Sequence, residues 1–148
     1  MTFVSVILAI LVIGALISYE RGLSSSKKAP FAGGNEPARP TLDPEFIKAH
    51  WAEIQQMLTI GPTGMKNALM EADKLLDHVM IAQGFKGKTM GDRLKSGGNN
   101  FSDLNAIWSA HKLRNHIAHE VAIDIVPTQI KGAVEKLGQG IKDLGVSL

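Results

Sequence analysis

The chain contains no cysteine. It therefore cannot form disulfide bonds, bind a metal ion through thiolates or use a thiol as a nucleophile. It also lacks internal repeats, and no segment has the alternating pattern and tight turn of a β-hairpin. A length of 148 residues suits one domain with a modest hydrophobic core, together with appended segments.

Most of the chain also lacks an excess of charge of either sign. The formal net charge is +2, and all of it arises before Leu42. The charged residues of that segment are Glu20, Arg21, Lys27, Lys28, Glu36 and Arg39. From Leu42 onward the charges cancel, so this region lacks the broad basic surface of a non-specific nucleic-acid binder. Any anion site in it must therefore be local.

The amino-terminal segment is a long apolar run without charge, from Phe3 to Tyr19. As a helix it is about 25 Å long, which nearly spans the hydrocarbon core of a bilayer. A cleavable signal peptide is disfavoured because Met1 and Thr2 carry no basic side chain and no suitable cleavage site follows. Residues 1–19 are therefore predicted to be a transmembrane anchor in contact with membrane lipid. The basic residues on its carboxyl side predict a cytoplasmic location for the rest of the chain.

Residues 20–41 are predicted to be a flexible linker, because serine, glycine and proline dominate them. Residues 42–148 then have helical periodicity interrupted by turn signals. The predicted helices span 43–59, 65–84, 102–120 and 127–144, with one short helix at 90–95. Ser102 and Asp103 are expected to cap the third long helix. Short connections between long helices predict an all-α fold, an up-and-down four-helix bundle.

The third long helix carries the most informative residues of the chain. Arg114 lies within an otherwise apolar arc of this helix, and Asn115, His111 and His119 share its inward side. An unpaired charge is costly to bury, so Arg114 needs a carboxylate, a carbonyl or an anionic ligand as its partner. His111 is a further candidate binding residue.

The run Arg114-Asn115-His116-Ile117-Ala118-His119 resembles the Arg-Asn-x-x-Ala-His motif of HEPN domains, which are small all-helical nucleotide-binding or ribonuclease modules. The segment 68–77 is similar to the long second helix of these bundles, and the resemblance spans roughly residues 43–145. It implies a toxin-like, metal-independent endoribonuclease that cleaves RNA by 2′-hydroxyl transesterification and uses no cofactor.

The resemblance also implies a role for each motif residue. His119 would exchange a proton with the 2′-hydroxyl or the leaving oxygen, Arg114 would neutralise the phosphate, and Asn115 would orient the imidazole or bind a phosphate oxygen. Arg114 and His119 are separated by about 140° around the helix, so one helix cannot direct both at one atom. HEPN ribonucleases are homodimers with facing motif helices, and an apolar patch is the predicted dimer seam here. This patch consists of Leu104, Ile107 and Trp108.

Two further groups of residues bear on binding. The glycine-rich loop at 85–100 is locally basic, and Lys86, Lys88 and Arg93 in it are predicted to guide RNA. His116 points about 60° away from His119, so the histidines of the motif helix do not form a metal site.

Other interpretations assign the motif no chemistry. Arg114 would then be a structural arginine paired with Glu71 or Asp73, and His119 would stabilise the end of the helix. The domain would be a non-catalytic module that dimerises or binds a nucleotide or a protein partner at the membrane. A purely structural membrane protein is the third hypothesis. The near-zero charge of the domain favours a module, whereas the polar residues on its inward side favour an enzyme.

Overall fold

The computed structural model describes residues 39–119 and 126–148. The predicted anchor at 1–19 and almost all of the predicted linker lie outside these residues. Within them, no helix is long and apolar enough to cross a membrane. Internal contacts divide the chain into Met1–Glu36 and Pro37–Leu148, and every described helix belongs to the second unit.

The described residues are all-helical and contain no strand, which confirms the predicted fold class. The elements are α2 (Pro44–Met57), α3 (Pro62–Ala82), α4 (Met90–Ser96), the 3-10 turn η1 (Gly98–Asn100), α5 (Leu104–His119) and α6 (Pro127–Asp143). Each predicted helix is present, with ends that differ by a few residues. The short helix that was expected at 90–95 is α4.

Local side chains determine where several helices begin. Asp43 Oδ1 accepts hydrogen bonds from the backbone amides of Glu45 and Phe46, so this carboxylate caps α2. Thr89 and Asp92 form a reciprocal capping box at the start of α4. These caps satisfy amide groups that a helix start leaves without an intrahelical partner.

The start of α5 differs from the prediction. Asp103 alone provides the side-chain cap, because its Oδ1 accepts from the amide of Ala106 at 2.9 Å. Ser102 instead donates its amide and its hydroxyl to Asp143 Oδ2 in α6, at 2.8 and 2.7 Å. Burial raises the pKa of Asp143, but the hydrogen bonds from Ser102 and Gln139 lower it by more, so its pKa lies below the ordinary value. Ser102 therefore fastens the start of α5 to the end of α6.

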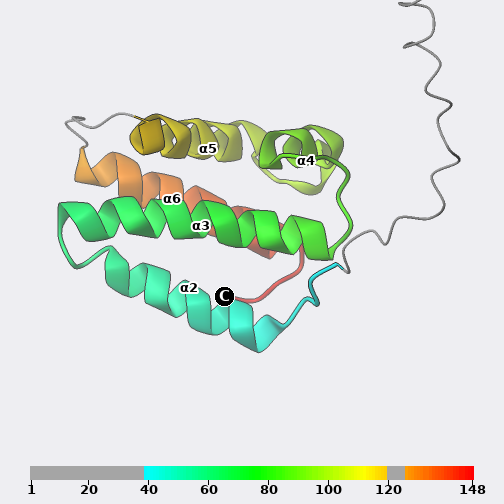
Figure 1. Ribbon diagram of the computed structural model, residues 1–148, viewed down its shortest axis with the longest axis horizontal. Helices are drawn as coiled ribbons and strands as arrows, with labels where there is room; N and C mark the ends of the chain where they lie inside the picture. Colours follow the sequence, from blue (N-terminus) through cyan, green and yellow to red (C-terminus); the bar gives the residue numbers. More distant parts are fainter. Residues whose placement is uncertain (1–38, 120–125) are drawn as a thin grey trace, which may run out of the picture. The chain divides into compact units, whose positions relative to one another are not determined.

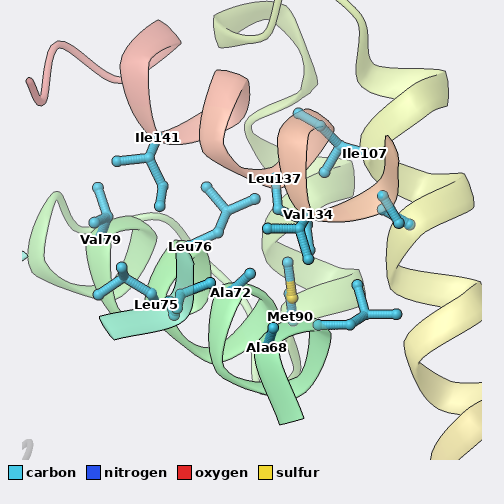
Figure 2. Close-up of a cluster of buried hydrophobic side chains, with 14 of the residues drawn as sticks. Ala68, Ala72, Leu75, Leu76, Val79, Met90, Ile107, Val134, Leu137 and Ile141 are labelled. Atoms are coloured by element: carbon cyan, nitrogen blue, oxygen red, sulfur yellow. The ribbon is translucent and has the colours of Figure 1, made fainter. Parts of the chain in front are cut away.

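Helix α3 lies at the centre of the domain and packs against α2, α5 and α6 (Figure 1). Figure 2 shows side chains of α3 meeting those of α4, α5 and α6 in a continuous apolar cluster. Gly140 of α6 lets the helices approach closely, because a Cβ at this position would lie 2.9 Å from Ile107 Cδ1 and 3.2 Å from Leu76 Cδ2. This close packing fixes how α3 and α5 are each rotated about their own axes, and hence which side chains face each other.

The predicted dimer seam is not an exposed patch. Ile107 is only 2% exposed and belongs to the core. Leu104 and Trp108 are partly buried against the domain itself, next to Gly98 and Gly91. The α5 face that was expected to bind a second copy therefore packs largely within its own chain.

Candidate functional site

A cluster of polar side chains lies between α3 and α5. Asp73 of α3 is 4% exposed, although its neighbours on this side of the helix are apolar. His111 and Arg114 contact it from α5, and Asn115 contacts both of these residues. Spacings of three and four residues place His111 on one side of the helix with Arg114 and Asn115. The sequence thus positions three polar groups of α5 opposite one buried carboxylate of α3.

Four contacts join these side chains into a closed ring, which we call the polar ring. His111 Nδ1 lies 2.8 Å from Asp73 Oδ1, and His111 Nε2 lies 3.2 Å from Asn115 Nδ2. Asn115 Oδ1 accepts a hydrogen bond from Arg114 Nη1 at 3.0 Å. Arg114 Nε completes the ring at 3.4 Å from Asp73 Oδ2.

The polar ring has one consistent arrangement of protons. Asn115 Nδ2 can only donate, so His111 Nε2 must accept and carries no proton. His111 Nδ1 then carries the proton and donates it to Asp73 Oδ1. The amide of Asn115 also has the correct orientation toward Arg114, because its oxygen faces a guanidinium donor. The network thus assigns the neutral Nδ1-protonated tautomer to His111.

Arg114 is incompletely satisfied by the polar ring. Its Nε is buried and makes no hydrogen bond within residues 39–119 and 126–148, despite the nearby Asp73 carboxylate. Its Nη2 makes no hydrogen bond to any residue that the structure describes. The side chain is 24% exposed. Arg114 therefore retains donor capacity that an anion outside the polar ring can use.

The structure also decides between the two predicted partners of Arg114. Asp73 is the partner, whereas Glu71 binds Lys74 at 2.7 Å and lies 3.5 Å from His50. The hydrogen bond from Lys74 is the main reason that the pKa of Glu71 lies below its ordinary value. Glu71 is thus part of a separate surface cluster.

His119 lies outside the polar ring. It is exposed on the last turn of α5, which the structure describes as far as this residue. Of the three predicted catalytic side chains, the fold brings together Arg114 and Asn115. His119 lies one turn beyond Asn115 and about 140° around the helix from Arg114. Sequence reasoning included His111 as a binding residue but did not foresee its hydrogen bond to Asp73.

The basic loop contains one residue with a structural role. Arg93 is 7% exposed, and its Nε and Nη2 donate to the two carboxylate oxygens of Asp77, both at 2.7 Å. Its Nη1 donates to the carbonyl of Gly87 at 2.8 Å. This guanidinium holds the loop to α3 through all three of its nitrogens, so it is not placed for the predicted RNA contact. Lys86 and Lys88 are exposed and remain candidates.

The surface beside the polar ring is hollowed in two places. An apolar groove of about 430 Å³ runs between α5 and α6 and is lined mainly by alanine, glycine and Leu113. A second recess of about 520 Å³ lies at the start of α5 and is lined by Lys95, Asn105, Trp108, Ser109 and Lys112. Among the described residues, no group of three histidine or acidic side chains is placed to hold a metal ion.

Comparisons with protein-family models, with curated proteins and with solved structures give no match for this chain. The resemblance to HEPN domains therefore rests on the motif in α5 and on its helical context. Its functional implications are carried forward as a proposal.

Proposed function

We propose that this chain is a membrane-tethered HEPN-like protein that acts as a metal-independent endoribonuclease. In this proposal the domain is an up-and-down four-helix bundle that functions as a homodimer. The observation that carries it is the state of Arg114. The polar ring holds this guanidinium in place, yet leaves it partly exposed and with unused donors.

The proposed reaction uses the three motif residues in different ways. His119 accepts the proton of a ribose 2′-hydroxyl, whose oxygen attacks the adjacent phosphorus. The bond from phosphorus to the 5′-oxygen breaks, and that oxygen gains a proton, leaving a 2′,3′-cyclic phosphate and a 5′-hydroxyl. Arg114 stabilises the negative charge that builds on the phosphate. Asn115 keeps Arg114 in position through its amide oxygen.

A homodimer would bring an arginine and a histidine of the motif to the same phosphate. Arg114 and His119 lie about 140° apart on α5, so the proposal pairs the arginine of one copy with the histidine of the other. The apolar groove between α5 and α6 is a surface on which a second copy can pack. Anchors in the same membrane would raise the local concentration of the two domains.

One observation favours a non-catalytic module instead. The carboxylate of Asp73 lies 3.4 Å from Arg114 Nε and offsets much of its charge. A site that must attract phosphate gains less from a compensated arginine than from a free one. Under this second proposal, the domain binds a nucleotide or a protein partner at the membrane, and the polar ring fixes the packing of α5 on α3.

A cleavage assay distinguishes the two proposals. The full chain, held in a neutral detergent, is incubated with mixed RNA in the presence of EDTA. His119→Ala should reduce cleavage at least about 100-fold, because it removes the proton-transfer group. His116→Ala, on the same helix, is the matched control and should cleave as the parent does. A parent without cleavage would leave the binding module as the better proposal.

The membrane topology has its own test. A reporter fused after Leu148 should be active only in the cytoplasm, because Arg21, Lys27 and Lys28 hold that side of the anchor inside. Reporter activity on the opposite side of the membrane would contradict the proposed orientation.

A further inference from the structure

The recess at the start of α5 combines an aromatic ring with two cations. Asn105, Trp108, Ser109 and Lys112 follow one another at helical spacing on α5, and Lys95 closes the recess from α4. Its volume of about 520 Å³ is sufficient for a nucleotide-sized ligand. None of these residues belongs to the polar ring.

The indole of Trp108 is held rigidly by its own domain. A Cβ on Gly91 would lie 3.2 Å from Trp108 Cη2, so the ring packs closely over this glycine of α4. The ring also meets His111 edge-on, with 6.0 Å between centroids and an interplanar angle of 71°. Trp108 is only partly buried and borders the recess. A fixed, partly exposed indole is a suitable platform for stacking an unpaired base.

The polar groups of the recess have free capacity for a ligand. Neither Lys112 nor Lys95 forms an ion pair with any described residue, although the charge of Lys95 makes a small contribution to lowering the pKa of Asp92. The carboxylate of Asp92 is already used by the Thr89 capping box, whose hydrogen bonds keep the pKa of Asp92 below its ordinary value. The amide of Asn105 makes no side-chain hydrogen bond within the described part of the chain. By contrast, the hydroxyl of Ser109 is already used, because it donates a hydrogen bond to the backbone carbonyl of Asn105.

We propose that this recess binds single-stranded RNA, with one base stacked on Trp108 and the adjoining phosphates held by Lys95 and Lys112. The amide of Asn105 is positioned to pair with the edge of the stacked base. An aromatic platform between lysines matches a base with its phosphates better than it matches an acidic peptide, which has no flat ring for the indole.

The position of the recess connects it to the motif. Trp108, Lys112, Asn115 and His119 lie within about 60° of one another around α5. They extend over about 16 Å of the helix axis. A strand that is anchored at Trp108 can therefore run along this face past the polar ring to His119. The choice of RNA as ligand rests on the proposed function, but binding in the recess does not require cleavage.

The test measures binding of an RNA that cannot be cleaved. A fluorescein-labelled 2′-O-methyl oligouridylate lacks the attacking hydroxyl, and its anisotropy is followed with the full chain in neutral detergent. Trp108→Leu keeps apolar volume but removes the stacking ring, and it should weaken binding roughly tenfold. Lys95→Ala and Lys112→Ala should each reduce the slope of log affinity against log salt by about one. Lys48→Ala, an exposed lysine of α2, is the matched control and should leave affinity and slope unchanged.

A second measurement tests the proposal if the Trp108→Leu variant does not fold. In a Trp51→Phe background, Trp108 is the only indole in the chain, and stacking of a base should quench its emission. Binding that persists in Lys95→Ala and Lys112→Ala without quenching would overturn the recess as a binding site. Equal loss of affinity in Lys48→Ala would show diffuse charge attraction and would also overturn it. Competition by polyglutamate that does not depend on Trp108 would indicate an acidic peptide ligand and contradict the proposal.

The two proposals fail separately. If the parent binds the oligonucleotide through Trp108 but cleaves no RNA, the ribonuclease proposal is contradicted. The recess would then still stand as an RNA-binding site. If the parent cleaves RNA while Trp108→Leu, Lys95→Ala and Lys112→Ala all bind the oligonucleotide normally, the recess is not the binding site. The ribonuclease proposal would then still stand.

Discussion

Two aspartates one turn apart on α3 each meet an arginine, and the two pairs are built differently. Asp77 receives two hydrogen bonds of 2.7 Å from Arg93, whose remaining end binds a backbone carbonyl. Asp73 lies 3.4 Å from Arg114 and makes no hydrogen bond to it. The first pair is a closed structural unit, whereas the second leaves arginine donors unused.

The reason for the difference is the number of groups that share the carboxylate. Among the described residues, Asp77 pairs only with Arg93, so both of its oxygens align with the planar guanidinium. Asp73 also accepts from His111 through Oδ1, which leaves only Oδ2 near Arg114. A carboxylate shared in this way presents only one oxygen to the guanidinium, so Asp73 does not form the two-bond pairing that Asp77 forms. Incomplete pairing, rather than burial alone, is the feature on which the proposed role of Arg114 rests.

The largest expected effect is on folding, at the closed pair. Arg93→Ala should lower the free energy of unfolding by about 3 kcal/mol, because it leaves the Asp77 carboxylate without its partner and releases the loop from α3. Urea unfolding measures this loss. Lys95→Ala, an exposed neighbour in α4, is the control and should change stability by less than about 0.5 kcal/mol. Similar unfolding of the two variants would show that the closed pair adds little stability.

Double-mutant cycles compare the two pairs directly. The coupling free energy between Asp77 and Arg93 should be about 2 kcal/mol, because two aligned charge-assisted hydrogen bonds are lost together. The coupling between Asp73 and Arg114 should be below about 1 kcal/mol, since this contact is long and Arg114 is partly exposed. Equal couplings would remove the distinction between a structural and a functional arginine.

A neutral substitution of Asp73 tests whether Arg114 is available to an anion. Asp73→Asn keeps the shape and the acceptor for His111 but removes the charge that offsets Arg114. Affinity for the 2′-O-methyl oligonucleotide should rise roughly threefold, which corresponds to the Coulomb energy of one unit charge at about 6 Å in a water-like medium. Asp77→Asn is the control and should leave affinity unchanged. An unchanged affinity in Asp73→Asn would place bound RNA away from Arg114.

The smallest effect concerns a carboxylate without any arginine. The folded-state pKa of Asp143 lies below its unfolded value, so its contribution is present above the unfolded pKa and is lost as pH falls through the folded pKa. Asp143→Asn should therefore reduce stability at pH 7 by less than about 1 kcal/mol, and the parent and variant should converge in acid. Urea unfolding of the parent and the variant, measured from pH 7 into the acid range, tests this expectation. A constant difference at every pH would contradict the assigned role of Ser102.

Much of the secondary structure follows from short-range signals. The Asp43-Pro44 pair and Pro127 mark helix starts in the sequence, and α2 and α6 begin there. By contrast, α3 begins at Pro62, within residues that were predicted to form a turn. Capping and turn preferences act over four residues or fewer, so they can be read without knowledge of the fold. The need of Arg114 for a partner was equally readable, because it follows from the cost of burying a charge in an apolar arc.

The identity of each partner was decided only by the tertiary structure. Glu71 and Asp73 are close in sequence but lie about 160° apart around α3, so the rotation of this helix selects one of them for Arg114. The same packing placed Arg93 on Asp77, Ser102 on Asp143 and Ile107 in the core. The sequence by itself determined which segments are helical and which charge had to be compensated. The relative rotation of packed helices, set by side chains far apart in the chain, determined which groups meet.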